Sequence, residues 1–183
     1  MCTGSGCIGL SILKNLLEEK NIEEGLLPKI ILADISKEAL LISEKNARSL
    51  FSEKSSLVKS KISFCQTNLF ENLKETFDII VSNPPYIPSH ITEELLKDGR
   101  SEPRLALDGD VNLNGEKSQS NDGLEVIRNL IPQAKKRLSP GGIILMETGE
   151  YNAKKAAKIA ENLGFKSKIH KDLEGQLRVV ELR

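Results

Sequence analysis

Short apolar runs alternate with segments of helical spacing along a chain of 183 residues. The runs that read as buried strands are residues 29–34, 62–66, 77–82 and 143–147, and amphipathic segments or polar loops separate them. Parallel strands need long crossover connections, which are usually helices. The alternation therefore predicts an α/β fold, a doubly wound and mostly parallel sheet with helices on both faces.

In the last third of the chain, the alternation of strands and helices gives way to two consecutive strands. Helical spacing at 124–138 and 153–163 is followed by two strands near 165–170 and 177–182, with a short turn around Gly175 between them. A turn this short joins only antiparallel strands. We therefore expect one Rossmann-like domain over residues 1–183 that closes with a C-terminal antiparallel hairpin.

Composition excludes several classes of protein. Lysine plus arginine equal aspartate plus glutamate at 26 each, so nucleic acid is not expected as the direct partner. No apolar run approaches the roughly 20 residues that span a bilayer, and no signal-peptide pattern opens the chain. The cysteines (2, 7 and 65) and histidines (90 and 170) lack metal-ligand spacing. We therefore expect no metal site, no membrane and a reducing cytoplasm.

The tetrapeptide Asn83-Pro84-Pro85-Tyr86, here called the hook, follows the apolar run 77–82. Two prolines fix φ and carry no N–H, and the residue before a proline is held extended. The hook thus stands at the carboxyl end of a strand, where open α/β sheets place their ligands. Its amide, its proline carbonyls and its aromatic ring suit a planar –NH2 group. The alternative is a tight turn that merely ends the strand, and the tetrapeptide alone does not decide between them.

Residues 1–9 form a glycine-rich turn with Gly4 and Gly6, and they run into a helical pattern. Such a turn normally joins a strand to a helix and lets a ligand approach the backbone. Glycine at a helix N-terminus can also serve geometry alone. The strand that should feed this turn would lie before residue 1, so we expect the chain to begin inside the motif, without the first strand.

Two polar residues follow the next two predicted strands. Asp34 stands about 28 residues after Gly6, in keeping with the later acidic residue that grips ribose hydroxyls in nucleotide sites. Asp34 could instead cap the following helix, but Ser36 can do that and would leave Asp34 free for a ligand. Asn68 is either a turn residue or a residue that faces the pocket bordered by Asp34.

Residues 88–122 are polar, and Gly99, Pro103, Gly109 and Gly115 interrupt them. A loop this long in a compact domain is usually functional or disordered. Within it, we expect residues 111–121 to be an exposed insertion. Because the loop follows the hook, residues 101–107 are predicted to lie near Tyr86 as a lid.

The chain resembles class I methyltransferases that use S-adenosylmethionine, and more closely the HemK/PrmC family of glutamine methyltransferases. The motifs are CTGSGCI at residues 2–8, ADIS at 33–36, SNPPYI at 82–87, EPRLALDG at 102–109, DGL at 122–124 and GGIILME at 141–147. Adenine-N6 methyltransferases of nucleic acids share the tetrapeptide. The 102–109 run is more particular to the glutamine family.

This resemblance implies methyl transfer from S-adenosylmethionine to the side-chain amide nitrogen of a glutamine in peptide chain release factors. It implies that the donor is bound by Cys2, Thr3, Gly4, Ser5 and Gly6 at its methionine end, Asp34 at the ribose, Asn68 and Leu69 at the adenine, with Asn83 bordering it. The resemblance also implies that Asn83 and the Pro84 carbonyl bind the substrate amide and that Pro85 and Tyr86 form the pocket wall, with Asn83, Pro84 and Tyr86 catalytic.

Three alternatives stay open at this point: a ribosomal-protein glutamine methyltransferase, an adenine-N6 nucleic-acid methyltransferase, and a non-catalytic truncated remnant. The family's N-terminal helical domain has no counterpart in these residues. Asn68 stands where the family usually has aspartate, and residues 111–121 exceed its usual connection.

Overall fold

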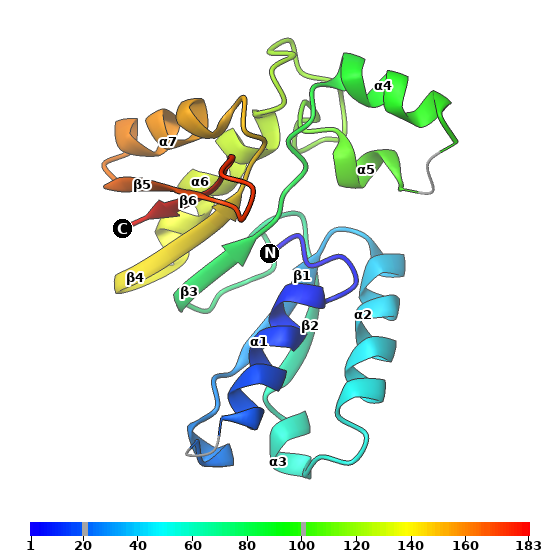
Figure 1. The fold of residues 1–183 in the computed structure, drawn as a ribbon, viewed down its shortest axis with the longest axis vertical. Coiled ribbons are helices and arrows are strands. Elements are labelled where there is room, and N and C mark those ends of the chain that lie inside the picture. The colour runs from blue at the N-terminus through cyan, green and yellow to red at the C-terminus, as the bar shows by residue number, and fades with distance from the viewer. Residues whose placement is uncertain (20–21, 100–101) are drawn as a thin grey trace. The chain divides into compact units, whose positions relative to one another are not determined.

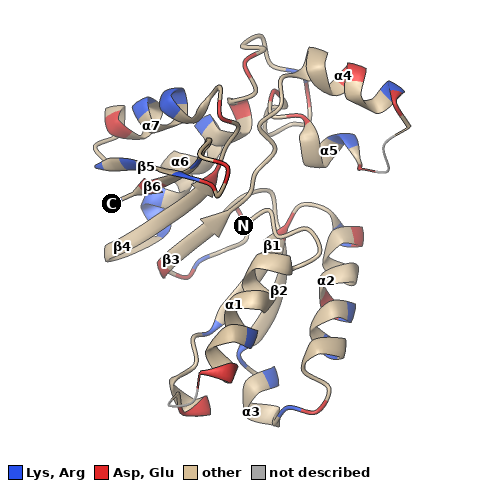
Figure 2. Ribbon diagram, in the orientation of Figure 1, with Lys and Arg blue, Asp and Glu red and all other residues tan. Residues whose placement is uncertain are grey.

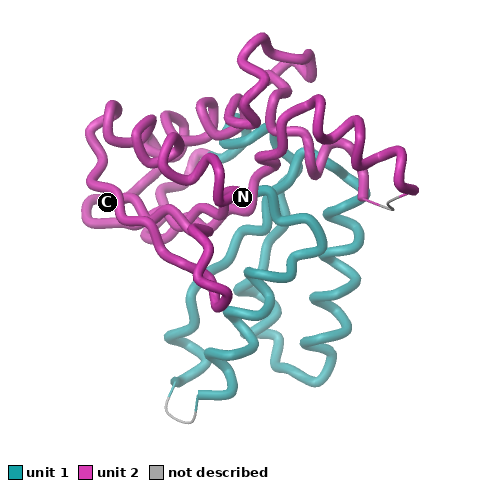
Figure 3. Tube along the Cα trace, turned by 45° about the horizontal axis from the view of Figure 1, so that its top comes forward, with its two compact units in different colours: residues 1–73 teal, residues 74–183 magenta. Residues whose placement is uncertain are grey.

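The computed structural model describes residues 1–19, 22–99 and 102–183. The chain divides into two compact units, Met1–Leu73 (unit 1) and Lys74–Arg183 (unit 2), coloured teal and magenta in Figure 3. The single catalytic domain over residues 1–183 stays a prediction. None of the described helices is long and apolar enough to cross a membrane.

Unit 1 contains two parallel strands with helices packed on them (Figure 1). Its elements are α1 (Cys7–Glu18), η1 (Glu24–Leu26), β1 (Ile30–Asp34), α2 (Lys37–Leu50), α3 (Ser56–Lys59) and β2 (Ile62–Gln66). The register runs from Ile30 opposite Ile62 to Asp34 opposite Gln66, so the two strands end together. A shared apolar core joins α1, α2 and β1 through Leu10, Leu13, Leu27, Leu32, Ala47, Phe51 and Val58.

Unit 2 holds a four-stranded mixed sheet in the order β3-β4-β6-β5. Its elements are β3 (Phe77–Ser82), α4 (Ser89–Lys97), α5 (Arg104–Leu107), α6 (Glu125–Arg137), β4 (Leu138–Glu147), α7 (Ala153–Asn162), β5 (Ser167–Lys171) and β6 (Leu177–Leu182). Strands β3 and β4 are parallel, and β5 and β6 form the predicted antiparallel hairpin. Strand β6 also pairs antiparallel with β4, so antiparallel pairs outnumber parallel ones in this unit.

Two helices of unit 2 bury narrow apolar faces. Helix α6 buries Ile127, Leu130, Ile131 and Ala134, and α7 buries Ala153, Ala156, Ala157 and Ala160. Each large aliphatic side chain removed from water contributes about 1.5–3 kcal/mol. The alanines of α7 contribute less each, but they let the helix backbone lie close to β5 and β6, which it packs against.

The structure differs from the predicted loop over residues 88–122, because α4 and α5 lie within it. Helix α4 turns the fully buried Ser89 and Thr92 inward. Small polar residues on the inner face hide the helical period that apolar residues would reveal. Strand β4 also begins earlier than predicted: Leu138 and Ile143 face Phe77 and Ile79, so residues 139–142 bulge out of the ladder.

Candidate active site

The glycine loop, residues 2–6, lies against the carboxyl end of β1. The N–H of Thr3 donates to the carbonyl of Ala33 at 3.0 Å, and the N–H of Gly4 donates to Asp34 Oδ2 at 2.8 Å. The Ser5 carbonyl accepts from Asn46 Nδ2 at 2.9 Å. Three contacts therefore fix a loop that the sequence marks only by its glycines.

Gly6 ends the loop in the left-handed region, with φ +83°, and it is the N-cap of α1. A Cβ here would collide with Ser43 Oγ and crowd Leu10, so only glycine fits the approach of α1 to α2. No side chain caps this helix. The N-terminus of α1 therefore presents backbone N–H groups beside the loop, an arrangement that favours anionic ligand groups.

Asp34, at the end of β1, holds the glycine loop with one oxygen and the next turn with the other. Its Oδ1 accepts the N–H of Ser36 at 3.0 Å, while Oδ2 accepts that of Gly4. Ser36 caps α2 by accepting from the N–H of Ala39 at 3.1 Å, which confirms that prediction. The expectation that Asp34 is thereby left free was wrong, because its carboxylate anchors two backbone N–H groups. A carboxylate keeps further lone pairs for a ligand.

Asn68 and Leu69 follow β2 at the same edge of the sheet. The N–H of Thr67 donates to the carbonyl of Asp34 at 2.9 Å, which extends the pairing of the two strands to the residue before Asn68. Leu69 is buried and has φ +49°, an uncommon conformation for leucine. Within unit 1 the structure therefore brings together all the residues predicted to bind the donor apart from Asn83: the glycine loop, Asp34, Asn68 and Leu69.

In unit 2, β3 ends at Ser82 and the hook continues it without a cis peptide bond. The Asn83 side chain is exposed, Pro84 is buried, and Pro85 and Tyr86 are half-buried. The amide of Asn83 is thus accessible at the end of a rigid segment.

Two side chains from the turn before α7 hold the hook at its last residue. The carbonyl of Tyr86 accepts from Tyr151 Oη at 3.1 Å and from Asn152 Nδ2 at 3.0 Å. The phenol of Tyr86 donates to Glu147 Oε1 at 3.4 Å. The sequence-based set of site residues included none of these three partners.

The segment after the hook is bound to the 102–109 motif. The N–H of Ile87 donates to the carbonyl of Leu107 at 3.0 Å, and the N–H of Gly109 donates to the carbonyl of Ile87 at 2.9 Å. A Cβ on Gly109 would approach Tyr86 Cα to 2.8 Å, and one on Gly123 would collide with the Tyr86 carbonyl. Both glycines therefore permit a backbone approach that any side chain would block.

Two buried aspartates, Asp108 and Asp110, flank Gly109 in the chain, and Asp110 also binds the N–H of Gly123. Asp110, fully buried, accepts three backbone N–H groups, from Ser89 at 3.0 Å, Asp122 at 3.0 Å and Gly123 at 2.7 Å. Asp108 accepts from Ser89 Oγ at 2.7 Å and pairs with Arg104 at 3.0 Å. The 102–109 run thus supports the hook through the carboxylate of Asp108 and through Gly109.

Electrostatics keep both tyrosines protonated. Burial raises the pKa of the Tyr86 phenol, and the Glu147 carboxylate raises that pKa further. Burial also raises the pKa of Tyr151, with the neighbouring Tyr86 as the next cause. A phenol whose pKa lies above its ordinary value of about 10 stays a donor at neutral pH, so Tyr151 can donate to the hook throughout the physiological range.

The predicted lid lies beside the hook, as expected, but part of it is a helix instead of a loop. Residues 104–107 form α5 and end at Leu107, which is bonded to Ile87 one residue past the hook. Ser101, the first residue of the predicted lid, lies outside the described residues. Residues 111–121 are largely exposed, as expected, and an isolated bridge pairs Val111 with Lys117.

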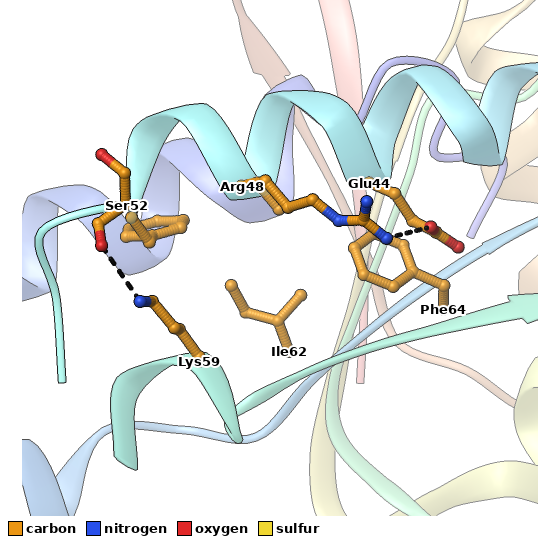
Figure 4. A pocket seen from close by; sticks show the side chains of 8 residues that line it. Glu44, Arg48, Ser52, Lys59, Ile62 and Phe64 are labelled. Carbon is orange, nitrogen blue, oxygen red and sulfur yellow. Dashed lines mark hydrogen bonds and ion pairs between the residues drawn. The ribbon is translucent and has the colours of Figure 1, made fainter. Parts of the chain in front are cut away.

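Unit 1 also has a pocket of about 530 Å³ between α2, α3 and β2 (Figure 4). Arg48 pairs with Glu44 at 3.3 Å across its rim, and Lys59 donates to the carbonyl of Ser52 at 3.0 Å. The floor is apolar, with Phe51, Ile62 and Phe64. None of the predicted site residues lines this pocket.

Comparisons with known proteins agree with the motifs. Residues 9–163 match the family model described as Eco57I restriction-modification methylase. The release factor glutamine methyltransferase of Borreliella burgdorferi is 35% identical over 183 residues, which are 100% of this chain and 55% of that protein. The ribosomal protein uL3 glutamine methyltransferase of Francisella tularensis is 31% identical, over 81% of this chain and 40% of that protein. The chain thus spans about half the length, or less, of these relatives.

Solved structures of similar fold are also methyltransferases. A ribosomal protein L11 methylase from Lactobacillus delbrueckii subsp. bulgaricus superposes with a TM-score of 0.60 at 17% identity, covering 99% of this chain and 64% of that one. The glycopeptide N-methyltransferase MtfA in complex with S-adenosyl-L-homocysteine gives 0.58 at 12% identity, covering 99% and 79%. These likenesses establish the class I methyltransferase fold. By its family match, the chain belongs to the methylase family described by the Eco57I model, and its similarity to curated glutamine methyltransferases agrees with the HemK/PrmC-like resemblance.

Proposed function

We propose that this chain is the catalytic part of an S-adenosylmethionine-dependent methyltransferase. Its acceptor is the side-chain amide nitrogen of a glutamine in a peptide chain release factor, and it acts in the cytoplasm. The observation that carries the proposal is the hook, whose backbone is held by Tyr151, Asn152 and two glycine contacts while the amide of Asn83 stays exposed.

A fixed pair of acceptors suits the chemistry of a carboxamide. The nitrogen of a glutamine side chain carries two hydrogens, and its lone pair is delocalised into the carbonyl, so it is a poor nucleophile. Asn83 Oδ1 and the Pro84 carbonyl accept one hydrogen each, which fixes the orientation of the nitrogen. Orientation of this kind contributes up to about 7–11 kcal/mol to a rate. Pro85 and the ring of Tyr86 form the walls of the pocket beside the plane of the substrate amide.

The residues gathered in unit 1 fit the donor. Among the described residues, and apart from the two chain neighbours of Gly4, no atom lies within 4 Å of the position that a Cβ on Gly4 would occupy, so a ligand can approach the loop backbone there. The glycine loop would hold the methionine end of S-adenosylmethionine, Asp34 would accept from the ribose hydroxyls, and Asn68 with Leu69 would border the adenine. The bound donor supplies an electrophilic methyl group on a sulfonium centre. The fold likeness to MtfA with S-adenosyl-L-homocysteine supports this assignment.

The names of the relatives support the acceptor. The Borreliella burgdorferi protein is named a release factor glutamine methyltransferase, and its 35% identity extends over the whole of this chain. The Francisella tularensis relative is named for a ribosomal protein, uL3, and shares the glutamine chemistry. Both names point to a glutamine in a protein of translation.

The second candidate is an adenine-N6 methyltransferase of nucleic acid, which the Eco57I family match favours. A carboxamide and the adenine amino group present the same planar –NH2 to the hook. Charge argues against it: basic and acidic residues total 26 each and occur together on α2 and α7 (Figure 2). Proteins that grip phosphates usually gather their lysines and arginines on one face.

One assay separates these candidates. The protein is incubated with S-adenosylmethionine and, in separate arms, a release factor, ribosomal protein uL3 and an adenine-containing DNA duplex. Mass spectrometry then maps any added methyl group. The proposal expects a methyl on a glutamine of the release factor, whereas a methyl on adenine alone, or none in any arm, would refute it.

A further inference from the structure

We infer that Asn152 is a positioning residue for the hook, and that with Tyr151 it holds the Tyr86 peptide and so keeps the Tyr86 carbonyl from receiving the acceptor amide. The inference rests on the proposed function and names residues that the sequence motifs do not contain. Asn152, Tyr151 and the hook all lie in unit 2.

The carbonyl of Tyr86 has no lone pair left for a substrate. A carbonyl oxygen has two lone pairs, and this one accepts from both Asn152 Nδ2 and Tyr151 Oη at 3.0 and 3.1 Å. Within the described part of the chain, no hydrogen bond occupies the carbonyl of Pro84. Asn83 Oδ1 and the Pro84 carbonyl, the pair assigned to the acceptor amide in the proposed function, therefore stay available for a planar –NH2 group, whereas the Tyr86 carbonyl does not.

Asn152 is itself held more firmly than Tyr151. It is 1% exposed, its N–H donates to the carbonyl of Gly149 at 3.1 Å, and its own carbonyl accepts from Ala156 at 2.9 Å as the N-cap of α7. Tyr151 is 58% exposed. The buried amide therefore sets the position of the Tyr86 peptide, and the exposed phenol adds to it.

A purely structural role predicts different behaviour from a positioning role. If Asn152 only satisfied a buried carbonyl, its loss would lower stability and leave the turnover of folded protein unchanged. If it positions the hook, its loss lowers kcat while the affinity for S-adenosylmethionine stays the same, because the donor residues other than Asn83 are elsewhere in the sequence.

Asn152→Asp gives a sharper signature because it keeps the shape of the side chain. An ionised carboxylate cannot donate to the Tyr86 carbonyl, whereas a protonated carboxyl can. We expect kcat of this variant, relative to the unaltered protein, to rise as the pH falls.

The test measures kcat and KM for a glutamine-containing release factor, and the dissociation constant of S-adenosylmethionine by calorimetry. We expect kcat to fall about tenfold in Asn152→Ala, the equivalent of one hydrogen bond, and less in Tyr151→Phe. The donor affinity should stay within about twofold, since one missing hydrogen bond would change it about tenfold. Asn162→Ala, at the exposed end of α7, is the matched control and should behave as the unaltered protein.

Hydrogen exchange gives a readout that needs no activity. The N–H of Ile87 is bonded to Leu107, so loosening the hook in Asn152→Ala should speed its exchange, and Asn162→Ala should not. If the unaltered protein methylates no glutamine, the proposed function fails, and exchange at Ile87 still decides the positioning role. Unchanged kcat and exchange in Asn152→Ala overturn the inference. If that variant does not fold, Tyr151→Phe and the pH profile of Asn152→Asp decide in the same way.

Discussion

Replacing Asp110 by alanine should destabilise unit 2 more than any other single change to a charged residue near the hook. Asp110 is fully buried and accepts three backbone N–H groups, from Ser89, Asp122 and Gly123. Alanine leaves those donors without their acceptor, two of them in a buried setting.

The expected loss in free energy of unfolding follows from the N–H groups that lose their acceptor. The N–H groups of Ser89 and Gly123 are bonded in a buried setting, and that of Asp122 in a partly buried one. A buried donor left unsatisfied costs about 1–3 kcal/mol, so the two buried ones together cost about 2–6 kcal/mol. This is a large part of the 5–15 kcal/mol that stabilises an ordinary domain. Asp110→Asn keeps one oxygen and should cost about 1–3 kcal/mol.

Urea unfolding followed by tyrosine emission measures this loss in the right unit. The chain has no tryptophan and two tyrosines, Tyr86 and Tyr151, and both lie in unit 2. Asp98→Ala is the matched control, because Asp98 is an exposed aspartate in the same unit, and it should change the free energy of unfolding by no more than about 0.5 kcal/mol. If Asp110→Ala also falls within about 0.5 kcal/mol of the unaltered protein, the proposed role of the carboxylate is refuted.

Three further predictions test the surroundings. Gly123→Ala should destabilise unit 2 by more than Gly175→Ala. Both glycines have positive φ, so both variants carry backbone strain, but only at Gly123 would the Cβ collide with backbone. The difference between the two variants in thermal unfolding therefore measures the cost of the collision. Arg128→Ala should lower the free energy of unfolding by about 1 kcal/mol at neutral pH, because hydrogen bonds from Arg128 lower the pKa of Asp122. A lowered pKa stabilises above the ordinary value of about 3.9, so the difference should vanish as the pH falls through the lower pKa of the folded state; a difference that persists in acid would contradict the pairing. Asp34→Ala should weaken S-adenosylmethionine binding in calorimetry, because the variant removes the carboxylate and leaves the N–H of Gly4 without its acceptor.

Local chemistry made much of the fold predictable. The strand ends, the cap at Ser36 and the antiparallel closing hairpin follow from residue types and turn lengths. The glycine loop, Asp34 and Asn68 were predictable as one group because parallel neighbouring strands end at the same edge of a sheet. The structure places them there.

What could not be predicted depends on contacts between distant segments. Nothing in the sequence around Asn152 shows that it donates to a carbonyl 66 positions away. The insertion of β6 between β4 and β5 also leaves no local pattern. Helix α4 was missed because its buried positions are Ser89 and Thr92, and polar residues in a sequence are typical of a loop. Only the structure shows that Ser89 has a buried partner, Asp108.

The central claim is that Asn83 is needed to bind the acceptor amide, and that neither the fold nor the donor affinity depends strongly on it although it borders the donor. The most direct measurement compares Asn83→Ala with the unaltered protein in two assays, methyl transfer to a release-factor glutamine and calorimetric affinity for S-adenosylmethionine. The account predicts that transfer is abolished while donor affinity is nearly intact. Equal losses in both assays, or transfer that survives the substitution, would contradict it.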